Sequence, residues 1–157
     1  MPSVGTITAQ HLIMQYFGYF FPFFFLGMWV LITFFISKAG WADLAEKYLY
    51  RSEFGNEFTG QRIGIISASV NSANYKNALV MKYNEQGIYL RPIFVFRLFH
   101  PPILIPWSEI KEARDKKILF YHYKQIIIGN PFVATISLKS SVFAEIEPAL
   151  TLYTLHK

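Results

Sequence analysis

The hydrophobic and polar positions divide the chain into two parts. Residues 12–36 are almost wholly apolar, and no Lys, Arg, Asp or Glu precedes Lys38. As an α-helix this run would reach about 37 Å, enough to cross a hydrocarbon core of about 30 Å with some tilt. Core helices of soluble proteins rarely run so far without a polar face, and the apolar run of a cleavable signal is shorter. The pattern therefore predicts a single transmembrane helix over residues 12–37, preceded by an N-terminal tail of residues 1–11.

A shorter helical stripe follows the apolar run. In GWADLAEKYLY, residues 40–50, the apolar side chains recur at the spacing of one helix face. This spacing predicts a juxtamembrane amphipathic helix over residues 40–51. Such a helix either lies in the membrane interface or packs on the domain that follows, and the sequence leaves both open. The next stretch, RSEFGNEFTGQR, has two glycines and mixed charge, and we expect the domain boundary there.

Beyond this linker the period becomes that of β-strands. FVATISLK, residues 132–139, alternates between an apolar and a more polar face, and NEQG, residues 84–87, is typical of a hairpin turn. Further strands are expected in RIGIISASV, NALVMKY, IYLRP, IFVFRLF, ILIPW, KILFYHY and QIII. SSVFAEIEPALTLY, residues 140–153, returns to helical spacing, with a kink expected at Pro148.

These elements predict the fold class of the second part. Residues 60–157 are expected to form a mainly β (α+β) domain, an antiparallel split barrel with a C-terminal helix. About seven antiparallel strands followed by one helix is the order of a pleckstrin-homology (PH) or GRAM-like domain.

The stretch HPPILIPW, residues 100–107, interrupts the strands with prolines. Proline offers no N–H to a sheet, so these residues are expected to end one strand and to keep the next at a sheet edge. The side chains of His100 and Leu104 are then expected to point outward. The stretch is interpreted as a break between strands, and alternatively as a docking surface for a partner protein made by His100, Pro101, Pro102 and Leu104.

The apolar helix is unusually aromatic, since more than half of residues 16–35 are Phe, Tyr or Trp. Such a helix can simply face lipid. Alternatively, its aromatic side chains pack against other membrane subunits, or against pigment or quinone rings, although the sequence carries no further support for such rings. The residues expected at this contact are Phe20, Phe21, Phe24 and Trp29.

The net charge of the chain indicates which kinds of partner it can bind. The net charge of +5, from 15 basic and 10 acidic residues, is a mild excess without the basic stripe that nucleic-acid binding requires. Membrane lipids are the more plausible partner, because a membrane helix would hold the domain near anionic headgroups. The residues expected to contact headgroups are Trp41, Lys116, Lys117 and Lys124.

Flanking charge predicts the orientation of the helix. Lys38, Lys47 and Arg51 follow the apolar run closely, so the positive-inside rule places the C-terminal domain in the cytoplasm. The absence of cysteine agrees with a reducing compartment without requiring one.

Known catalytic patterns are missing from the sequence. The chain has no cysteine, no GxSxG, no HExxH and no phosphate-binding loop, and its histidines, His11, His100, His122 and His156, are scattered. The charged run EIKEARDKK, residues 109–117, is typical of a solvated loop or sheet edge. We therefore expect no catalytic residues, no cofactor and no metal site.

Two segments resemble a group of uncharacterised small bacterial membrane proteins. They are GWADLAEKY and GIYLRPIFVFRLFHPPILIPWSEI, which together cover most of residues 40–110. The group's pattern is a GWxxLAxxY stretch followed by a GLYL…HPPLxIPWxxI block. The resemblance implies a family of small bacterial single-pass membrane proteins and no known activity.

These observations favour a non-catalytic, membrane-anchored protein that serves as an accessory, assembly or scaffolding subunit of a larger membrane complex. The alternative is a PH-like module that binds lipid or peptide at the membrane surface.

Overall fold

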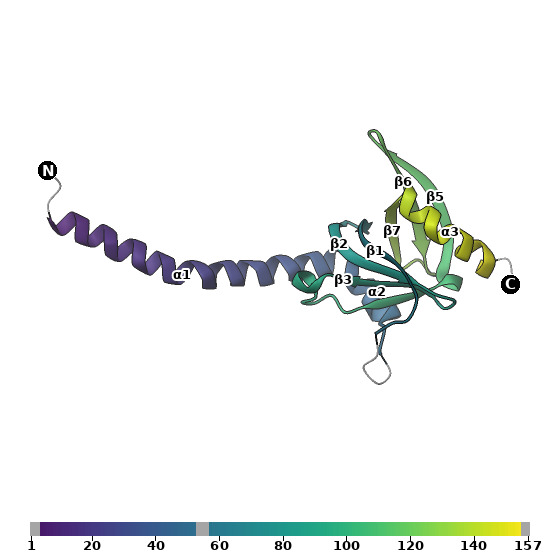
Figure 1. Cartoon of the computed structure of the whole chain (residues 1–157), viewed down its shortest axis with the longest axis horizontal. Coiled ribbons are helices and arrows are strands. Elements are labelled where there is room, and N and C mark those ends of the chain that lie inside the picture. Colours follow the sequence, from purple (N-terminus) through teal and green to yellow (C-terminus); the bar gives the residue numbers. More distant parts are fainter. Residues whose placement is uncertain (1–3, 53–56, 155–157) are drawn as a thin grey trace.

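The computed structural model describes residues 4–52 and 57–154, and it joins one long helix to a β domain (Figure 1). The helical part comprises α1 (Val4–Ile36), a π-helical turn η1 (Ser37–Trp41) and α2 (Ala42–Tyr48). The strands are β1 (Gln61–Val70), β2 (Ala73–Tyr83), β3 (Gly87–Pro92), β4 (Ile103–Pro106), β5 (Ile110–Ile118), β6 (Tyr121–Ile128) and β7 (Ala134–Lys139). Two short 3-10 turns, η3 (Phe94–Phe96) and η4 (Trp107–Glu109), precede and follow β4, and α3 (Ser140–Thr154) ends the described chain.

The helical part is continuous. Ile36 and Ala42, on either side of the π-turn, both have α-helical backbone angles, so α1, η1 and α2 form one rod. Within the described residues, one helix, Met14–Tyr48, is long and apolar enough to span a membrane. The rod runs through Pro22 and curves gently in Figure 1. The predicted boundaries differ from this rod, since residues 4–11 of the expected tail are helical and residues 42–48 continue the same helix.

The β domain is a single antiparallel sheet that curls on itself. Its strand order is β4-β3-β2-β1-β7-β6-β5, and every neighbouring pair is antiparallel. The pairing of β1 with β2 shifts register at Gly64 and again at Ala68. Such irregularities bend a strand and increase its twist. β1 pairs with β7 only at its end, through Ala68–Val70, which lets the two halves of the sheet face one another.

Alternating apolar positions from both halves fill the space inside the curl. Met81, Leu90 and Ile105 from one half meet Ile126 and Leu138 from the other, all of them fully buried. The helix α3 packs on this core through residues spaced three and four apart. Those residues are the buried Phe143 and Ile146 and the partly buried Val142, Ala149, Leu150 and Tyr153.

The predicted fold class is confirmed at the level of its elements: a long apolar N-terminal helix, an antiparallel α+β domain and a C-terminal helix. The turn at residues 84–87 is confirmed by a hydrogen bond from the Asn84 amide to the Gly87 carbonyl, 3.1 Å long. β4 lies at an edge of the sheet, and so does β5, which contains most of the charged run. Residues 53–56 of the expected linker, and His156, lie outside the described residues.

Two strand predictions were wrong. IFVFRLF is not a strand but a turn around η3, because its backbone bonds locally, from the Phe96 amide to the Ile93 carbonyl and from the Arg97 amide to the Phe94 carbonyl. KILFYHY is a hairpin whose turn at Leu119 and Phe120 separates β5 from β6. Leu119 has a φ of 55°, a conformation that turn sequences usually assign to Gly or Asn, so composition gave no sign of it.

Candidate functional site at the helix–domain junction

One face of the long helix docks onto the β domain. The face begins at Trp29, which is partly buried, and continues through Thr33, Ser37 and Trp41, which are buried. These four residues are spaced four apart, whereas an α-helical turn holds 3.6 residues, so on a pure α-helix the face would drift around the axis. The π-turn takes up an additional residue, with the Ala42 amide bonding back to the Ser37 carbonyl. The drift is thereby offset and the face stays aligned with the domain.

Residues 93–99 form the part of the domain that reaches furthest along α1, and we call them the apolar loop (Figure 1). The ring of Phe96 lies 5.2 Å from the ring of Trp29, centroid to centroid, and the ring of Phe99 lies 5.4 Å from that of Phe34. The Ser37 hydroxyl donates a 2.7 Å hydrogen bond to the Phe99 carbonyl. The loop is thus held against the last two turns of α1.

The contact between Trp29 and Phe96 extends a ladder of aromatic rings. Phe17, Phe21, Phe25 and Trp29 follow each other at four-residue spacing, with centroids 6.0, 6.3 and 6.4 Å apart. These are distances at which aromatic rings attract one another. One stripe of α1 is therefore lined with rings down to the domain. A second pair, Phe20 and Phe24, lies beside it at 6.1 Å.

Gly40 and Trp41 make the closest contact between helix and sheet. A Cβ atom at Gly40 would collide with the Val70 carbonyl, so only glycine lets the two backbones approach this closely. Trp41 is fully buried, and its indole Nε1–H donates a 2.8 Å hydrogen bond to the Pro101 carbonyl. The prediction that Trp41 contacts lipid headgroups is therefore wrong. Of the two readings of residues 40–51, packing on the domain is the one observed.

His100 is buried beneath the junction, with 1 % of its surface exposed. Its Nδ1 lies 2.9 Å from the Leu98 carbonyl, which can only accept, so Nδ1 carries the proton. Its Nε2 then accepts from the Tyr75 hydroxyl, 3.0 Å away. Burial lowers the pKa of His100 and raises that of Tyr75, so both groups are held neutral.

The expectation that His100 points outward is wrong, because Tyr75, distant in sequence, offers it a buried partner. The prolines beside it also face the helix: the Pro101 carbonyl bonds to Trp41, and the Pro102 carbonyl accepts from the Tyr50 amide at 2.9 Å. Leu104 is half-buried on β4. The chain's own helix thus covers the His100 surface, and docking of a partner at Leu104 stays a prediction.

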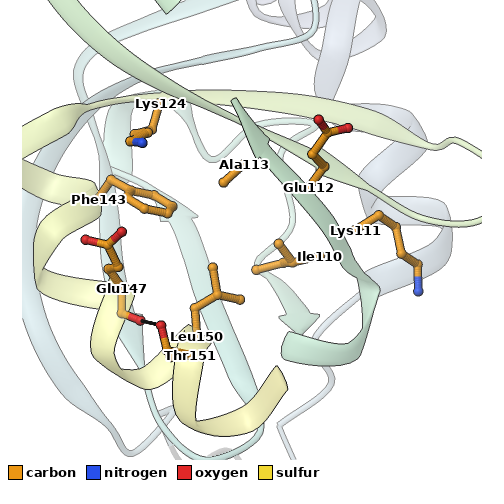
Figure 2. Close-up of a pocket in the computed structure, with 9 residues that line it drawn as sticks. All are labelled: Ile110, Lys111, Glu112, Ala113, Lys124, Phe143, Glu147, Leu150 and Thr151. Atoms are coloured by element: carbon orange, nitrogen blue, oxygen red, sulfur yellow. Dashed lines mark hydrogen bonds between the residues drawn. The ribbon is translucent and has the colours of Figure 1, made fainter. Parts of the chain in front are cut away.

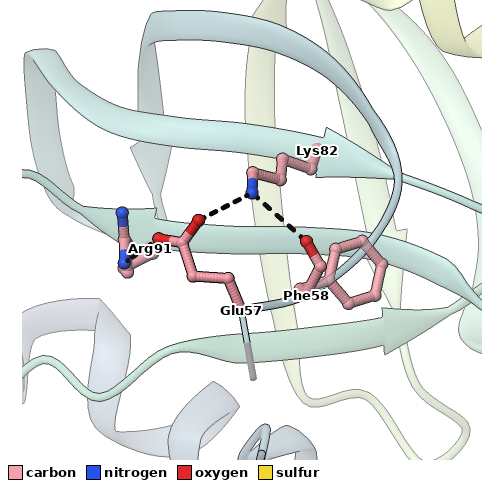
Figure 3. A network of polar contacts seen from close by, with 4 residues as sticks. All are labelled: Glu57, Phe58, Lys82 and Arg91. Atoms are coloured by element: carbon pink, nitrogen blue, oxygen red, sulfur yellow. Dashed lines mark hydrogen bonds and ion pairs between the residues drawn. The ribbon is translucent and has the colours of Figure 1, made fainter. Parts of the chain in front are cut away.

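Ion pairs and hydrogen bonds brace the junction on its other sides. The Tyr48 hydroxyl donates to Glu109 Oε2 at 2.7 Å, and this bond, with Lys47 nearby, holds the pKa of the Glu109 carboxyl below its usual range. Beyond the end of α2, Glu57 bridges two strands, accepting from Lys82 on β2 at 3.3 Å and from Arg91 on β3 at 3.0 Å (Figure 3). Lys82 also donates to the Phe58 carbonyl. The pKa of Glu57 is lowered chiefly by Lys82.

The lysines expected at headgroups are not gathered in one place. Lys124 is half-buried, paired with Asp115 at 2.8 Å and lying over the Phe143 ring. Lys116 and Lys117 are exposed, and the alternation of a strand turns them to opposite faces of β5.

Lys116 belongs to a hollow on the outer face of the sheet, which we call the basic trough. It lies between the β1–β2 turn and the β5–β6 hairpin, and its cations are Lys76, Lys116 and Lys139. Lys116 pairs across strands with Tyr123, and Tyr123 with Lys139, so the two lysines flank one ring. The rest of the described lining is mainly hydroxyl and amide side chains and includes no Asp or Glu.

A second hollow lies between β5 and α3 (Figure 2). Its apolar side chains, Ile110, Phe143 and Leu150, point into it, while Glu112 is engaged by Arg114 at 2.6 Å. Within the described ranges, no three His, Asp or Glu side chains lie close enough together to hold a metal ion.

The predicted intramembrane contact residues divide into two groups. Phe20, Phe21 and Phe24 are exposed on α1, so their contact with other subunits stays a prediction. Trp29 instead meets Phe96 of its own chain. Comparison with known protein families, curated proteins and solved structures yielded no match.

Several junction residues were not singled out from the sequence. They are Thr33, Ser37, Gly40, Tyr75, Phe96 and Phe99. The four-residue spacing from Trp29 to Trp41 is the one sequence signal that could have indicated the docked face.

Proposed function

We propose that this protein is a non-catalytic, single-pass membrane protein that serves as an accessory or assembly subunit of a larger membrane complex. The observation that carries the proposal is the unbroken joint between an apolar helix and the core of the β domain, made by Ser37, Gly40 and Trp41. A simple tether needs only a flexible linker. A rigid joint instead fixes the height and rotation of a domain relative to its membrane segment, as a scaffolding role requires.

The proposed orientation places the β domain in the cytoplasm of a bacterial cell, at the cytoplasmic membrane. Lys38, Lys47 and Arg51 on the domain side of the helix support this orientation through the positive-inside rule. The PH-like character of the domain is part of the proposal, supported by seven antiparallel strands followed by one helix.

Within the bilayer, the exposed rings of Phe20, Phe21 and Phe24 are the proposed contact with other subunits. If two of these rings each pair with a ring of another subunit, the two pairs would contribute about 1–3 kcal/mol to association. This is in addition to the free energy gained by burying apolar surface.

Native mass analysis of the tagged protein, extracted from its own membranes in mild detergent, tests the proposal. We expect a co-purifying partner with the wild type and a severalfold loss of it in the Phe20→Leu/Phe24→Leu variant. The matched control is Tyr19→Leu/Phe23→Leu, which removes two rings at the same spacing from a face about 100° away around the helix. A free monomer without partner would contradict the proposal.

The basic trough favours a second candidate function, a module that binds anionic lipid headgroups. Lys76, Lys116 and Lys139 lie there without an acidic neighbour in the described lining, and each basic residue near an anionic surface contributes about 1 kcal/mol.

Titrating phosphatidylglycerol into the detergent-solubilised chain, with phosphatidylcholine as the neutral comparison, tests this candidate by native mass analysis. Replacing the three trough lysines with Ala should abolish the preference for the anionic lipid. Replacing Arg51, Arg62 and Lys111, which are exposed outside the trough, removes the same charge and should preserve it. Equal effects of the two variants would exclude a specific site.

A further inference from the structure

We propose that the apolar loop, residues 93–99, enters the hydrocarbon region of the bilayer as a second membrane-embedded element beside α1. This inference rests on the proposed function, in that it takes α1 to span a membrane. Its proposed partner is the acyl-chain region of the leaflet on the domain side.

The position of the loop along α1 is the first argument. Its rings meet α1 at Trp29 and Phe34, on the membrane side of Lys38, the first charged residue after the apolar run. Trp29 precedes Lys38 by two and a half turns, or roughly 13 Å along the axis. With Lys38 at headgroup level, Phe96 therefore lies well inside a hydrocarbon core of about 30 Å.

A shallower position would leave apolar surface in water. If Trp29 marked the edge of the hydrocarbon, the next two turns of α1 would stand in the aqueous phase. Those turns carry the exposed side chains of Leu31, Ile32 and Phe35. Keeping them in lipid takes the apolar loop into lipid as well.

The side chains of the loop fit hydrocarbon. Phe94 is 81 % exposed and Val95 53 % exposed, and slightly less than half of the surface of Leu98 and of Phe99 is exposed. The one charged residue is Arg97, whose guanidinium lies 5.9 Å from the centre of the Phe94 ring. A long arginine side chain can extend to the headgroups while its stem stays in an apolar layer.

The backbone of the loop is a further argument. Irregular chain is costly in hydrocarbon because its amide groups have no water to bond, so it needs partners within the protein. Five carbonyls of the loop have such partners. Those of Ile93, Phe94 and Arg97 accept backbone amides, that of Leu98 accepts His100 Nδ1–H, and that of Phe99 accepts the Ser37 hydroxyl.

Two buried polar side chains thereby gain a role. Ser37 and His100 lie on opposite sides of the junction, and each donates to a carbonyl at the end of the loop. An exposed carbonyl in water could bond to solvent instead, whereas one in hydrocarbon could not. The two side chains satisfy a stretch of backbone that lipid would otherwise leave without hydrogen bonds.

The chain has no cysteine, so single-cysteine variants of the full protein carry a nitroxide label at one chosen site. We compare Phe94→Cys in the loop, Phe24→Cys in the middle of α1 and Ser108→Cys on the exposed side of the domain. Each is reconstituted in vesicles of phosphatidylcholine and phosphatidylglycerol. Collisions with oxygen, which concentrates in hydrocarbon, and with a water-soluble nickel chelate are measured for each label.

We expect the label at position 94 to resemble that at position 24, with high oxygen and low nickel accessibility, while position 108 shows the reverse. Nickel access at 94 equal to that at 108, with 24 still protected, would overturn the loop proposal and leave the spanning helix intact. Nickel access at 24 would overturn the proposed function itself. Low accessibility of the label at position 94 to both reagents would show that the loop contacts protein and not lipid, and would overturn the inference.

Discussion

His100 connects three parts of the molecule through one ring. Its nitrogens bond to the end of the apolar loop and to Tyr75 on β2, and its ring centroid lies 5.7 Å from that of Trp41 on the helix. A proton added to Nε2 would turn the accepting nitrogen into a donor and place a charge in the core. The neutral form is therefore part of the folded structure.

This arrangement predicts a pH dependence. Burial lowers the pKa of His100 below its ordinary value of 6.5, so the unfolded chain binds the proton more readily than the folded one. The contribution to stability is present above the unfolded pKa and is lost as the pH falls towards the folded pKa. We expect the midpoint temperature of thermal unfolding, measured in detergent, to fall as the pH is lowered from about 7 to about 5. His100→Gln, which can still donate to Leu98 and accept from Tyr75, should flatten the profile, and an unchanged slope would contradict this account.

Gly40 offers a test of the close helix–sheet approach. Gly40→Ala places a methyl group against the Val70 carbonyl, and we expect it to lower the free energy of unfolding by about 1–3 kcal/mol. Gly27→Ala is the matched control, because nothing lies within 4 Å of a Cβ there and alanine is the better helix former. Denaturant unfolding in detergent measures both. Equal stability of the two variants would show that the junction is looser than the structure has it.

At the scale of elements, the hydroxyls of Thr33 on α1 and of Ser37 on η1 have different roles. Ser37 bonds across the junction to the apolar loop, whereas Thr33 bonds back to the Trp29 and Val30 carbonyls of its own helix. Ser37→Ala leaves the Phe99 carbonyl without its donor, which costs about 1–3 kcal/mol for a buried group. We expect faster amide hydrogen exchange in residues 93–99 of this variant. Thr33→Val should leave that exchange unchanged, and acceleration in both variants would assign the effect to general loosening of the helix.

The elements that could be predicted from the sequence are those with a strong period of their own. The apolar run of α1, the alternation in β7 and the helical spacing of α3 each carry their own evidence. IFVFRLF has no such period, since nearly every residue in it is apolar. The path of this segment depends instead on its packing against α1. The hairpin at Leu119 was missed because its turn lacks the usual residues.

The candidate site was predictable only in part, for a physical reason. Trp41 was recognised as part of an apolar stripe, but whether that stripe faced lipid or protein depended on Pro101 and Tyr75, which lie far along the chain. His100 was singled out, but its side chain was predicted to point outward, because a position at a sheet edge suggests exposure. Its burial depends on a hydrogen-bond partner on β2, which the local sequence does not indicate. A local sequence pattern can therefore indicate such residues but not the distant residues that they contact.

At the scale of the whole molecule, the continuous helix and the domain behave in the structure as one body. The helix passes through η1 into the core, and the domain reaches back along α1 through the apolar loop. Contacts on both sides of the π-turn restrain bending there, so the orientation of the domain is set by the helix.

The distance between a nitroxide at position 24 in α1 and one at position 108 in the domain tests this central claim most directly. The native chain is free of cysteine, so a Phe24→Cys/Ser108→Cys variant in vesicles carries labels at those two sites. Pulsed electron–electron double resonance then measures the distribution of distances between the two labels. Dilution with unlabelled protein removes the contribution of labels on different copies. The account predicts a single narrow distribution. A broad or multiply peaked one would contradict it and make the helix a flexible tether.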